Sequence, residues 1–384
     1  MDLRAVLETV VELGASDLHL KVGSPPYLRI LGSLRSLDLP RLTARELEAV
    51  ADQLLTPGQR KEFEMASEID FAFGIAGLAR FRSNFYRQRG TLAMVFRRVS
   101  GVQDLSFEGL NLPPVLKDLA QRPRGLVLVT GTVGSGKSTT LAAMIHWVNS
   151  TTAKNIVTLE DPIEHLFADG ISYVSQREVG LDTKSFSEGL RHILRQDPDV
   201  IMIGEIRDVE TMQIALTAAD TGHLVLSTLH TIDAVETVNR VLSFFPPHQG
   251  QSVRYLLAST LEAVISQRLI PRADGAGRVP AVEVMLNTAT IADFVIDPDK
   301  TPLIAQAMQE GTTAYGMQTF DQSLMQYYTQ GIITLEDALA NCSSPTEFDL
   351  RVKGIHASSD QTWNDFEKLK EHAPAEKVAG MSKI

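Results

Sequence analysis

The sequence predicts an α/β protein, because continuous apolar strands alternate with helices along much of its length. Four strand-like runs, GLVLVTG, NIVTLE, DVIMIGE and HLVLSTLH, lie between residues 125 and 230, and helical segments such as STTLAAMIHWVN separate them. Strands that are apolar on both faces and joined through helices form a parallel sheet covered on both sides. At 384 residues with 44% hydrophobic content, the chain is long enough for two or three packed domains.

The composition changes along the chain in a way that predicts its domains. The N-terminal part combines an opening helix, a helix around TARELEAVADQLL, the strand-like run LRILGSLRSL and a strand-rich block, which together form a small α+β domain. The part beyond residue 245 is mainly helical, apart from LIPRADGAGRVPAVEVML, which predicts two strands around a Gly-rich turn. The predicted regions are an N-terminal domain at residues 1–100, a linker at 101–112, a second domain with a helical C-terminal part at 113–356, and a flexible tail at 357–384.

Composition also excludes several classes of protein. No apolar run approaches the ~18 residues of a membrane span, and the opening MDLRAVLETVVELGASD lacks the basic and apolar regions of a signal peptide, so we expect a cytoplasmic protein. The single cysteine, Cys342, rules out a disulfide framework and a multi-cysteine zinc site. The net charge of -11 argues against nucleic acid as the main partner.

The strongest motif is GTVGSGKST at residues 131–139, which matches G-x-x-x-x-G-K-[ST] between an apolar strand and a helix. Its glycines let backbone N–H groups wrap phosphate oxygens, Lys137 neutralises the β- and γ-phosphates, and the Ser138 hydroxyl can bind Mg²⁺. The sequence contains no Asn-Lys pair and hence no N-K-x-D guanine signature, which favours ATP over GTP. The predicted nucleotide-binding residues are Gly131, Thr132, Val133, Gly134, Ser135, Gly136, Lys137, Ser138 and Thr139.

Two acidic segments follow strands at the sheet edge where ligands bind in open α/β sheets. The strand in DPDVIMIGEIRD delivers Glu205, which we predict as the general base, although Gly204 stands where a Walker B strand usually carries aspartate. The segment TLEDPIEH supplies Glu160 and Glu164 as alternatives for the base. The predicted Mg²⁺ ligands, some acting through water, are Ser138, Glu160 and Asp161.

The segment TGHLVLSTLHT carries a histidine at each end of a predicted strand, His223 and His230. Taken alone, both fit ordinary strand-end residues. Since this strand follows the Glu205 strand and its helix, its end can lie beside the γ-phosphate, where a neutral imidazole can sense that phosphate by hydrogen bonding. We therefore predict that both histidines belong to the site.

Together, GTVGSGKST, TLEDPIEH, RQDPDVIMIGEIRD and TGHLVLSTLHT resemble the Walker A motif, Asp box, Walker B motif and His box of the type II/type IV secretion ATPase superfamily. The segments ASDLHLKVGSPPYLRILG and RFRSNFYRQRG are similar to the opening domain of type IV pilus twitching-motility ATPases. The resemblance implies an N-terminal PAS-like domain, a RecA-like P-loop ATPase domain, and a homohexameric ring that hydrolyses ATP with Mg²⁺. It also implies an inner-membrane pilus platform protein as partner, and therefore peripheral association with the cytoplasmic face of the inner membrane.

Within the superfamily, the sequence resembles the pilus retraction branch, because pilus-extension and type II secretion ATPases usually carry a four-cysteine zinc module. The segment LIAQAMQE, residues 303–310, lacks the arginines of the A-I-R-N-L-I-R-E signature found in many retraction motors. This departure leaves open whether the protein is the principal retraction motor, an accessory paralogue beside a second retraction ATPase, or a divergent copy. A secretion ATPase of the same superfamily is a further alternative. A RecA-like DNA translocase is an alternative of another class, which the acidic charge disfavours.

A ring raises the question of which arginine reaches the nucleotide of a neighbouring subunit. The block ARFRSNFYRQRGTLAMVFRRV predicts a hairpin with Arg89 and Gly90 in its turn, so that Arg82 stands opposite Arg97. Two arginines opposed across strands repel each other unless an anion lies between them. We predict that Arg82 and Arg97 reach a nucleotide or carboxylates in the adjacent subunit, and the alternative is that they pair with acids of their own domain.

Overall fold

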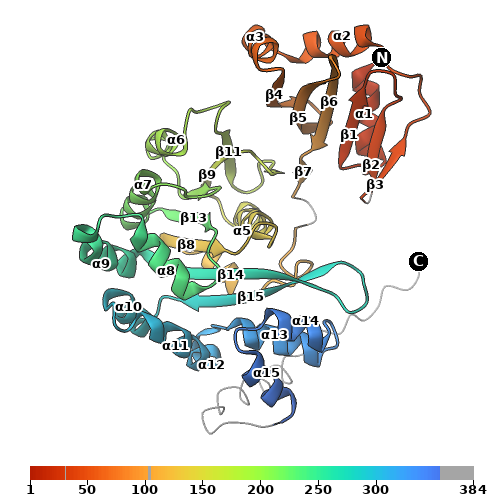
Figure 1. Ribbon diagram of the computed structural model, residues 1–384. Coiled ribbons are helices and arrows are strands. Elements are labelled where there is room, and N and C mark those ends of the chain that lie inside the picture. Colours follow the sequence, from red (N-terminus) through yellow and green to blue (C-terminus); the bar gives the residue numbers. More distant parts are fainter. Residues whose placement is uncertain (31, 103–104, 355–384) are drawn as a thin grey trace, which may run out of the picture. The chain divides into compact units, whose positions relative to one another are not determined.

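The structure is a computed structural model and describes residues 1–30, 32–102 and 105–354 (Figure 1). The described residues divide into two compact units, the first comprising residues 1–101 together with 164–166 and the second comprising 102–163 and 167–354. The fold class is α/β, as predicted. The tail predicted at residues 357–384 lies outside the described residues.

The first unit is built on a six-stranded antiparallel sheet in the order β3-β2-β1-β6-β5-β4. Its elements are α1 (Leu3–Glu12), β1 (Asp17–Lys21), β2 (Tyr27–Ile30), β3 (Ser33–Ser36), α2 (Ala44–Leu54), α3 (Pro57–Ala66), β4 (Glu68–Ile75), β5 (Ala79–Gln88), β6 (Thr91–Arg98) and β7 (Ser100–Gly101). Leu3, Leu7 and Val10 recur at helical spacing on α1 and are buried, which explains why this segment forms a core-facing helix. Thr43 and Glu46 form a capping box that fixes the start of α2.

The hairpin predicted for β5 and β6 is confirmed in its turn and its register. Arg89 and Gly90 both have positive φ, 50° and 74°, as a two-residue type I′ turn requires. Arg82 lies opposite Arg97 in the register. The apolar face is buried, and the residues that share it are Phe81, Phe85, Leu92, Met94 and Phe96.

The second unit contains a seven-stranded sheet in the order β11-β9-β12-β13-β8-β14-β15, parallel except for the β14–β15 pair. Its strands are β8 (Gly125–Thr130), β9 (Asn155–Glu160), β11 (Tyr173–Glu178), β12 (Val200–Ile203), β13 (Leu224–Leu229), β14 (Leu261–Pro271) and β15 (Arg278–Leu286). The four predicted parallel strands are therefore confirmed. The short strand β10 (His165–Leu166) pairs instead with β7, within the first unit.

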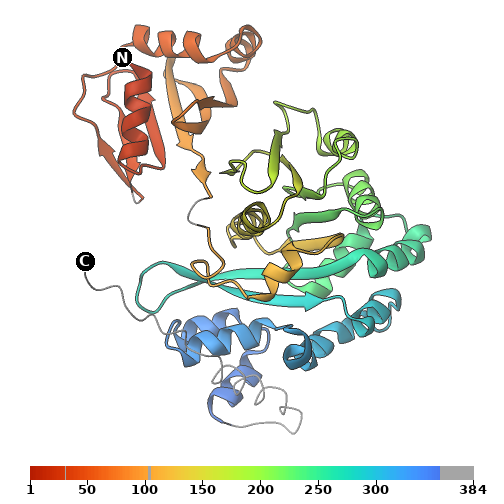
Figure 2. The ribbon, with the colours of Figure 1, turned by 180° about the vertical axis from the view of Figure 1, so that it is seen from behind.

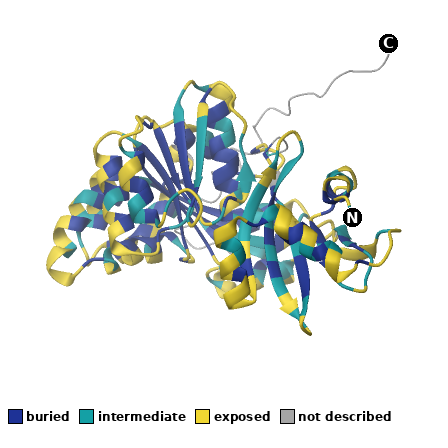
Figure 3. Cartoon of the chain, turned by 90° about the horizontal axis from the view of Figure 1, so that it is seen from above, coloured by how far each residue is buried: buried dark blue, intermediate teal, exposed yellow. Residues whose placement is uncertain are grey.

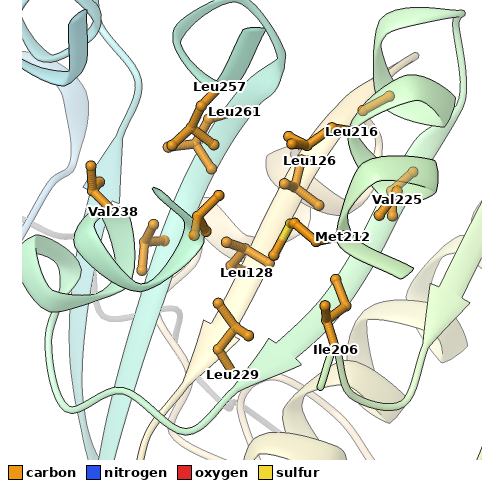
Figure 4. Close-up of a cluster of buried hydrophobic side chains, with 14 of the residues drawn as sticks. Leu126, Leu128, Ile206, Met212, Leu216, Val225, Leu229, Val238, Leu257 and Leu261 are labelled. Carbon is orange, nitrogen blue, oxygen red and sulfur yellow. The ribbon is translucent and has the colours of Figure 1, made fainter. Parts of the chain in front are cut away.

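Helices cover both faces of this sheet, which is why its strands carry apolar residues on both sides. The helices are α4 (Val115–Ala120), α5 (Lys137–Thr151), α6 (Phe186–Ile193), α7 (Val209–Asp220), α8 (Ala234–Ser243), α9 (Gly250–Thr260), α10 (Ala289–Ile296), α11 (Ile304–Glu310), α12 (Thr312–Tyr315), α13 (Phe320–Thr329), α14 (Leu335–Asn341) and α15 (Pro345–Val352). The core under α6 to α11 contains Leu126 and Leu128 of β8 beside Met212 and Leu216 of α7 (Figure 4). The opposite face packs against α4 and α5.

The buried strands stand out in Figure 3 against the exposed outer faces of the helices. Figure 2 shows the long β14–β15 hairpin from behind, with α13 and α14 packed beside it through a separate apolar cluster around Phe320. Among the described residues, no helix combines the length and the apolar character needed to cross a membrane.

Candidate active site

The P-loop follows β8 directly and opens α5, the context that its sequence requires. Gly131 has φ +141°, and a Cβ built there would lie 2.5 Å from both the Gln267 carbonyl oxygen and the Ser135 hydroxyl, so only glycine fits. Gly136 has φ +95° and supplies no side-chain cap to α5. The first amides of α5 therefore remain available to a ligand, and the helix dipole makes that position favourable for an anion.

Lys137 is buried, and its ammonium group is folded onto the loop. The Nζ donates hydrogen bonds to the carbonyl oxygens of Gly131 at 2.8 Å and Thr132 at 3.0 Å. Its distance to His230 Nδ1 is 3.5 Å. The ammonium group is thus held at the phosphate-binding loop and adjacent to the end of β13, where it can neutralise phosphate charge.

Glu205 follows β12 and contacts His230 and Arg207 at the carboxyl ends of the parallel strands. One carboxylate oxygen lies 3.1 Å from His230 Nε2, and the other pairs with Arg207, which also lies 3.6 Å from Asp161. Because β12 lies between β9 and β13, the ends of these three strands bring their polar residues together. A continuous chain of contacts therefore runs from Lys137 through His230 and Glu205 to Arg207 and Asp161.

Glu160 lies at the end of β9 and is only 6% exposed. Its carboxylate accepts hydrogen bonds from Thr158 Oγ1 at 2.7 Å and from Gln176 Nε2 at 3.1 Å. A Cβ built on Gly204 would lie 3.4 Å from the Glu160 Cα, so Gly204, which stands where an aspartate is usual, lies against the backbone at the end of β9. Of the two alternatives to Glu205, Glu160 lies in the same unit as Glu205, whereas the exposed Glu164 belongs to the first unit.

The described residues contain no group of three or more His, Cys, Asp or Glu side chains arranged to hold a metal ion. This is compatible with Mg²⁺, which proteins usually bind through one or two side chains together with substrate phosphates and water. Ser138 is exposed at the start of α5, beside the loop amides that face the ligand. The donor set therefore fits a magnesium ion that arrives with the nucleotide.

The two predicted histidines lie at opposite ends of strand β13. His230 follows β13 at the P-loop edge, whereas His223 precedes β13, and its Nδ1 lies 2.9 Å from the Ala218 carbonyl oxygen at the end of α7. Because β13 is six residues long, roughly 20 Å separate its ends. The structure thus does not bring His223 to the P-loop of its own chain, because a strand places its two ends at opposite edges of the sheet.

The two arginines of the first unit have different surroundings. Arg97 donates through Nε to Asp17 at 2.8 Å, the pairing within one domain that was the alternative prediction. Burial opposes ionisation of Asp17, but the hydrogen bonds from Arg97 and Ser16 hold the pKa of its carboxyl below the usual value. The guanidinium group of Arg82, by contrast, forms no hydrogen bond or ion pair within residues 1–30, 32–102 and 105–354.

Sequence reasoning missed three residues of these networks. Arg207 lies two positions after Glu205 in GEIRD, and a cation immediately after an acidic strand end was a usable signal. Gln176 and Asp17 gave no such signal. Gln176 approaches Glu160 only because β11 pairs with β9, and Asp17 meets Arg97 only because β1 pairs with β6.

The comparisons with known proteins agree with this geometry. Residues 94–341 match the family model described as "Type II/IV secretion system protein". The chain belongs to this family. It is an ATPase. Among its relatives is the type IV pilus retraction ATPase PilT of Pseudomonas aeruginosa, which is 44% identical over 348 residues, 91% of this chain and 100% of that protein.

A second relative is the type IV pilus ATPase PilU of Pseudomonas aeruginosa, which is 41% identical over 361 residues, 94% of each chain. The crystal structure of the pilus retraction motor PilT with bound ADP superposes with a TM-score of 0.82 at 43% identity, covering 90% of this chain and 98% of that one. The shared fold and the ADP in that structure support nucleotide binding by this chain.

Replacing His230 with alanine is expected to lower the kcat of this ATPase by about tenfold or more, because His230 joins Lys137 to Glu205. His223→Ala is expected to change kcat less than about twofold, since that histidine lies at the other end of β13 and contacts the Ala218 carbonyl oxygen of α7. Steady-state ATP hydrolysis by both variants checks this pair. Equal losses in the two variants would contradict the placement described above.

Proposed function

We propose that this ATPase is a homohexameric motor that powers type IV pilus retraction from the cytoplasmic face of the inner membrane, acting on a pilus platform protein. The observation that carries the proposal is the extent of the likeness to PilT, which is named a retraction ATPase and is matched over 91% of this chain and all of its own length. The likeness therefore covers the first unit as well as the P-loop domain.

The proposed mechanism assigns a task to each group at the sheet edge. Lys137 and the loop amides hold the phosphates. Ser138 would hold a Mg²⁺ ion that arrives with the nucleotide, Glu160 and Asp161 would hold the water around it, and the ion would supply positive charge beside the phosphates. Glu205 then polarises the attacking water, and His230 transmits the state of the γ-phosphate through its contacts with Lys137 and Glu205.

The arginines of the first unit complete the site of an adjacent subunit in this proposal. Arg97 donates to Asp17 through its Nε, so the two terminal nitrogens of its guanidinium group can bind an anion. Arg82 lies directly opposite Arg97 on the neighbouring strand. An arginine supplied by a neighbour stabilises charge on the transferring phosphoryl group.

Arg82→Ala and Arg97→Ala are each expected to lower kcat by about a hundredfold while the affinity for ATP changes less than about threefold. The matched control is Arg35→Ala, which removes an exposed arginine from β3 of the same sheet. Hydrolysis and equilibrium binding of a fluorescent ATP analogue separate the two effects. Wild-type turnover in both variants would exclude the assigned role.

A second candidate function is that of an accessory retraction ATPase. It is favoured by the 41% identity to PilU, close to the 44% identity to PilT, and by the absence of arginines from α11. The two candidates differ in whether the protein works alone.

The test is expression of this protein in a twitching bacterium from which its own retraction ATPase genes have been deleted. A principal motor is expected to restore twitching, and the Glu205→Gln variant is expected not to do so. Restoration only when a second retraction ATPase is also present would identify the accessory role. No restoration in either background would contradict pilus retraction.

A further inference from the structure

Glu283 is a buried carboxylate that none of the proposed catalytic steps uses. It lies on β15 and is 8% exposed. Its Oε1 accepts a hydrogen bond at 2.9 Å from the backbone N–H of Ala234, the first residue of α8. A carboxylate at this position satisfies a free amide of the helix and complements the helix dipole.

A row of polar side chains lies between Glu283 and the strand that carries the P-loop. Glu283 lies opposite Ser266 of β14, and Ser266 lies opposite Thr130 of β8. Thr130 Oγ1 donates to Ser266 Oγ at 3.0 Å, and both hydroxyls are fully buried. Since Thr130 is the last residue before Gly131, this row ends at the P-loop.

Ala234 follows directly after the short segment that contains His230. Residues 230–233 connect β13 with α8, and Asp233 caps the helix by accepting from Glu236 N at 2.7 Å. Thr231 Oγ1 lies 2.6 Å from Thr237 Oγ1. The segment is therefore fixed by β13 at one end and, at the other, by α8, whose first amide is bound by Glu283.

We propose that Glu283 is a positioning residue for ATP hydrolysis: it fixes the start of α8 against the P-loop strand and so holds His230 between Lys137 and Glu205. The inference rests on the proposed role of His230. Displacement of a catalytic group by about 1 Å can reduce turnover a hundredfold, so a residue behind the site can affect kcat without touching the nucleotide.

The surroundings of Glu283 make its contribution to stability depend on pH. Burial and the neighbouring Asp233 carboxylate raise the pKa of Glu283 to about 7, against the hydrogen bond from Ala234 and the charge of Arg268. In the unfolded chain, the pKa returns to the ordinary value of 4.5. The folded form loses stability as pH rises from the unfolded to the folded pKa, so an uncharged replacement stabilises the fold most above pH 7.

The experiment compares Glu283→Leu, Glu283→Gln and the wild type. Glu283→Leu removes the acceptor and is expected to lower kcat about tenfold or more while KM for ATP stays within about twofold. Glu283→Gln keeps an oxygen that accepts from Ala234 and is expected to retain most of the activity. The Tm of Glu283→Gln should exceed that of the wild type by a margin that grows from pH 5 to pH 8.

The matched control is Glu262→Gln on β14, a carboxyl whose pKa is also raised by burial but which lies at the start of that strand and pairs with Arg122. It is expected to leave kcat unchanged. Ser266→Ala removes the hydroxyl that lies between Glu283 and Thr130. This variant is expected to lower kcat as well, but by less than Glu283→Leu. Wild-type kcat in both Glu283→Leu and Ser266→Ala, or a loss of kcat that only follows a lowered Tm, would overturn the inference.

A double-mutant cycle connects the effect to His230. If Glu283 acts through His230, Glu283→Leu should cause little further loss in the His230→Ala background. Additive losses would overturn the inference and leave the role of His230 intact. If His230→Ala alone keeps wild-type kcat, the proposed role of His230 and the inference fail together.

Discussion

Glu205→Gln is expected to lower the kcat for ATP hydrolysis by about a thousandfold while nucleotide binding is preserved. Glutamine keeps the size of the side chain and its contact distance to His230, but it cannot accept the proton of the attacking water. The P-loop contacts of Lys137 do not involve Glu205, so the phosphates remain bound. Single-turnover hydrolysis of ATP, with binding measured in parallel, tests both parts of this expectation.

The control for this variant is Glu210→Gln, an exposed glutamate on α7 that pairs with Arg191. It should hydrolyse ATP at the wild-type rate. If Glu205→Gln retained more than about a tenth of wild-type kcat, the general base would have to be another residue, and Glu160 would be the first to test because its buried carboxylate lies in the same unit.

Lys137→Ala is expected to weaken ATP binding by about a hundredfold and to remove measurable hydrolysis. Hydrogen bonds to charged groups contribute about 1.5–3 kcal/mol each, and Lys137 is the cation that the P-loop itself supplies to the phosphates. Alanine also removes the two hydrogen bonds that hold the Gly131 and Thr132 carbonyl oxygens. The variant therefore loses both the charge and part of the shape of the loop.

Titration with a fluorescent ATP analogue measures this loss, and circular dichroism verifies that the fold is retained. Lys184→Ala, which removes an exposed lysine of the same unit, is the control and should bind normally. Wild-type affinity in Lys137→Ala would show that the phosphates are held elsewhere and would remove the basis for the P-loop assignment.

Local patterns predicted much of this fold because their physical causes lie close together in the sequence. The turn at Arg89 and Gly90 fixed which residues face each other across β5 and β6, so the Arg82–Arg97 register was predictable. The P-loop strand and helix were predictable for the same reason, since the glycines, Lys137 and the flanking apolar runs are contiguous.

Features that depend on strand order could not be read from the sequence. The adjacency of β12 and β13 decides that Glu205 meets His230, and the adjacency of β11 and β9 decides that Gln176 approaches Glu160. Glu283 lies 49 positions from Ala234, and its role depends on the β14–β15 pairing. No local pattern distinguishes such a residue from an ordinary strand glutamate.

The position of His223 was predicted incorrectly relative to the P-loop for a different reason. The segment TGHLVLSTLHT made its two histidines look alike, yet a strand carries residues at its two ends to opposite edges of a sheet. Chain direction alone could have separated them, because the P-loop follows the C-terminal end of β8 and β13 runs parallel to β8. His230 lies at that edge and His223 at the other.

A ring motor whose sites hydrolyse ATP can be tested by measuring ATP turnover per protomer and molecular mass together over a range of protein concentrations with Mg²⁺. Turnover per protomer is expected to rise with the fraction of hexamer, because in the proposed ring Arg82 and Arg97 act on an adjacent subunit. A monomer that hydrolyses ATP at the full rate, or a hexamer that does not hydrolyse it, would exclude the proposed ring motor.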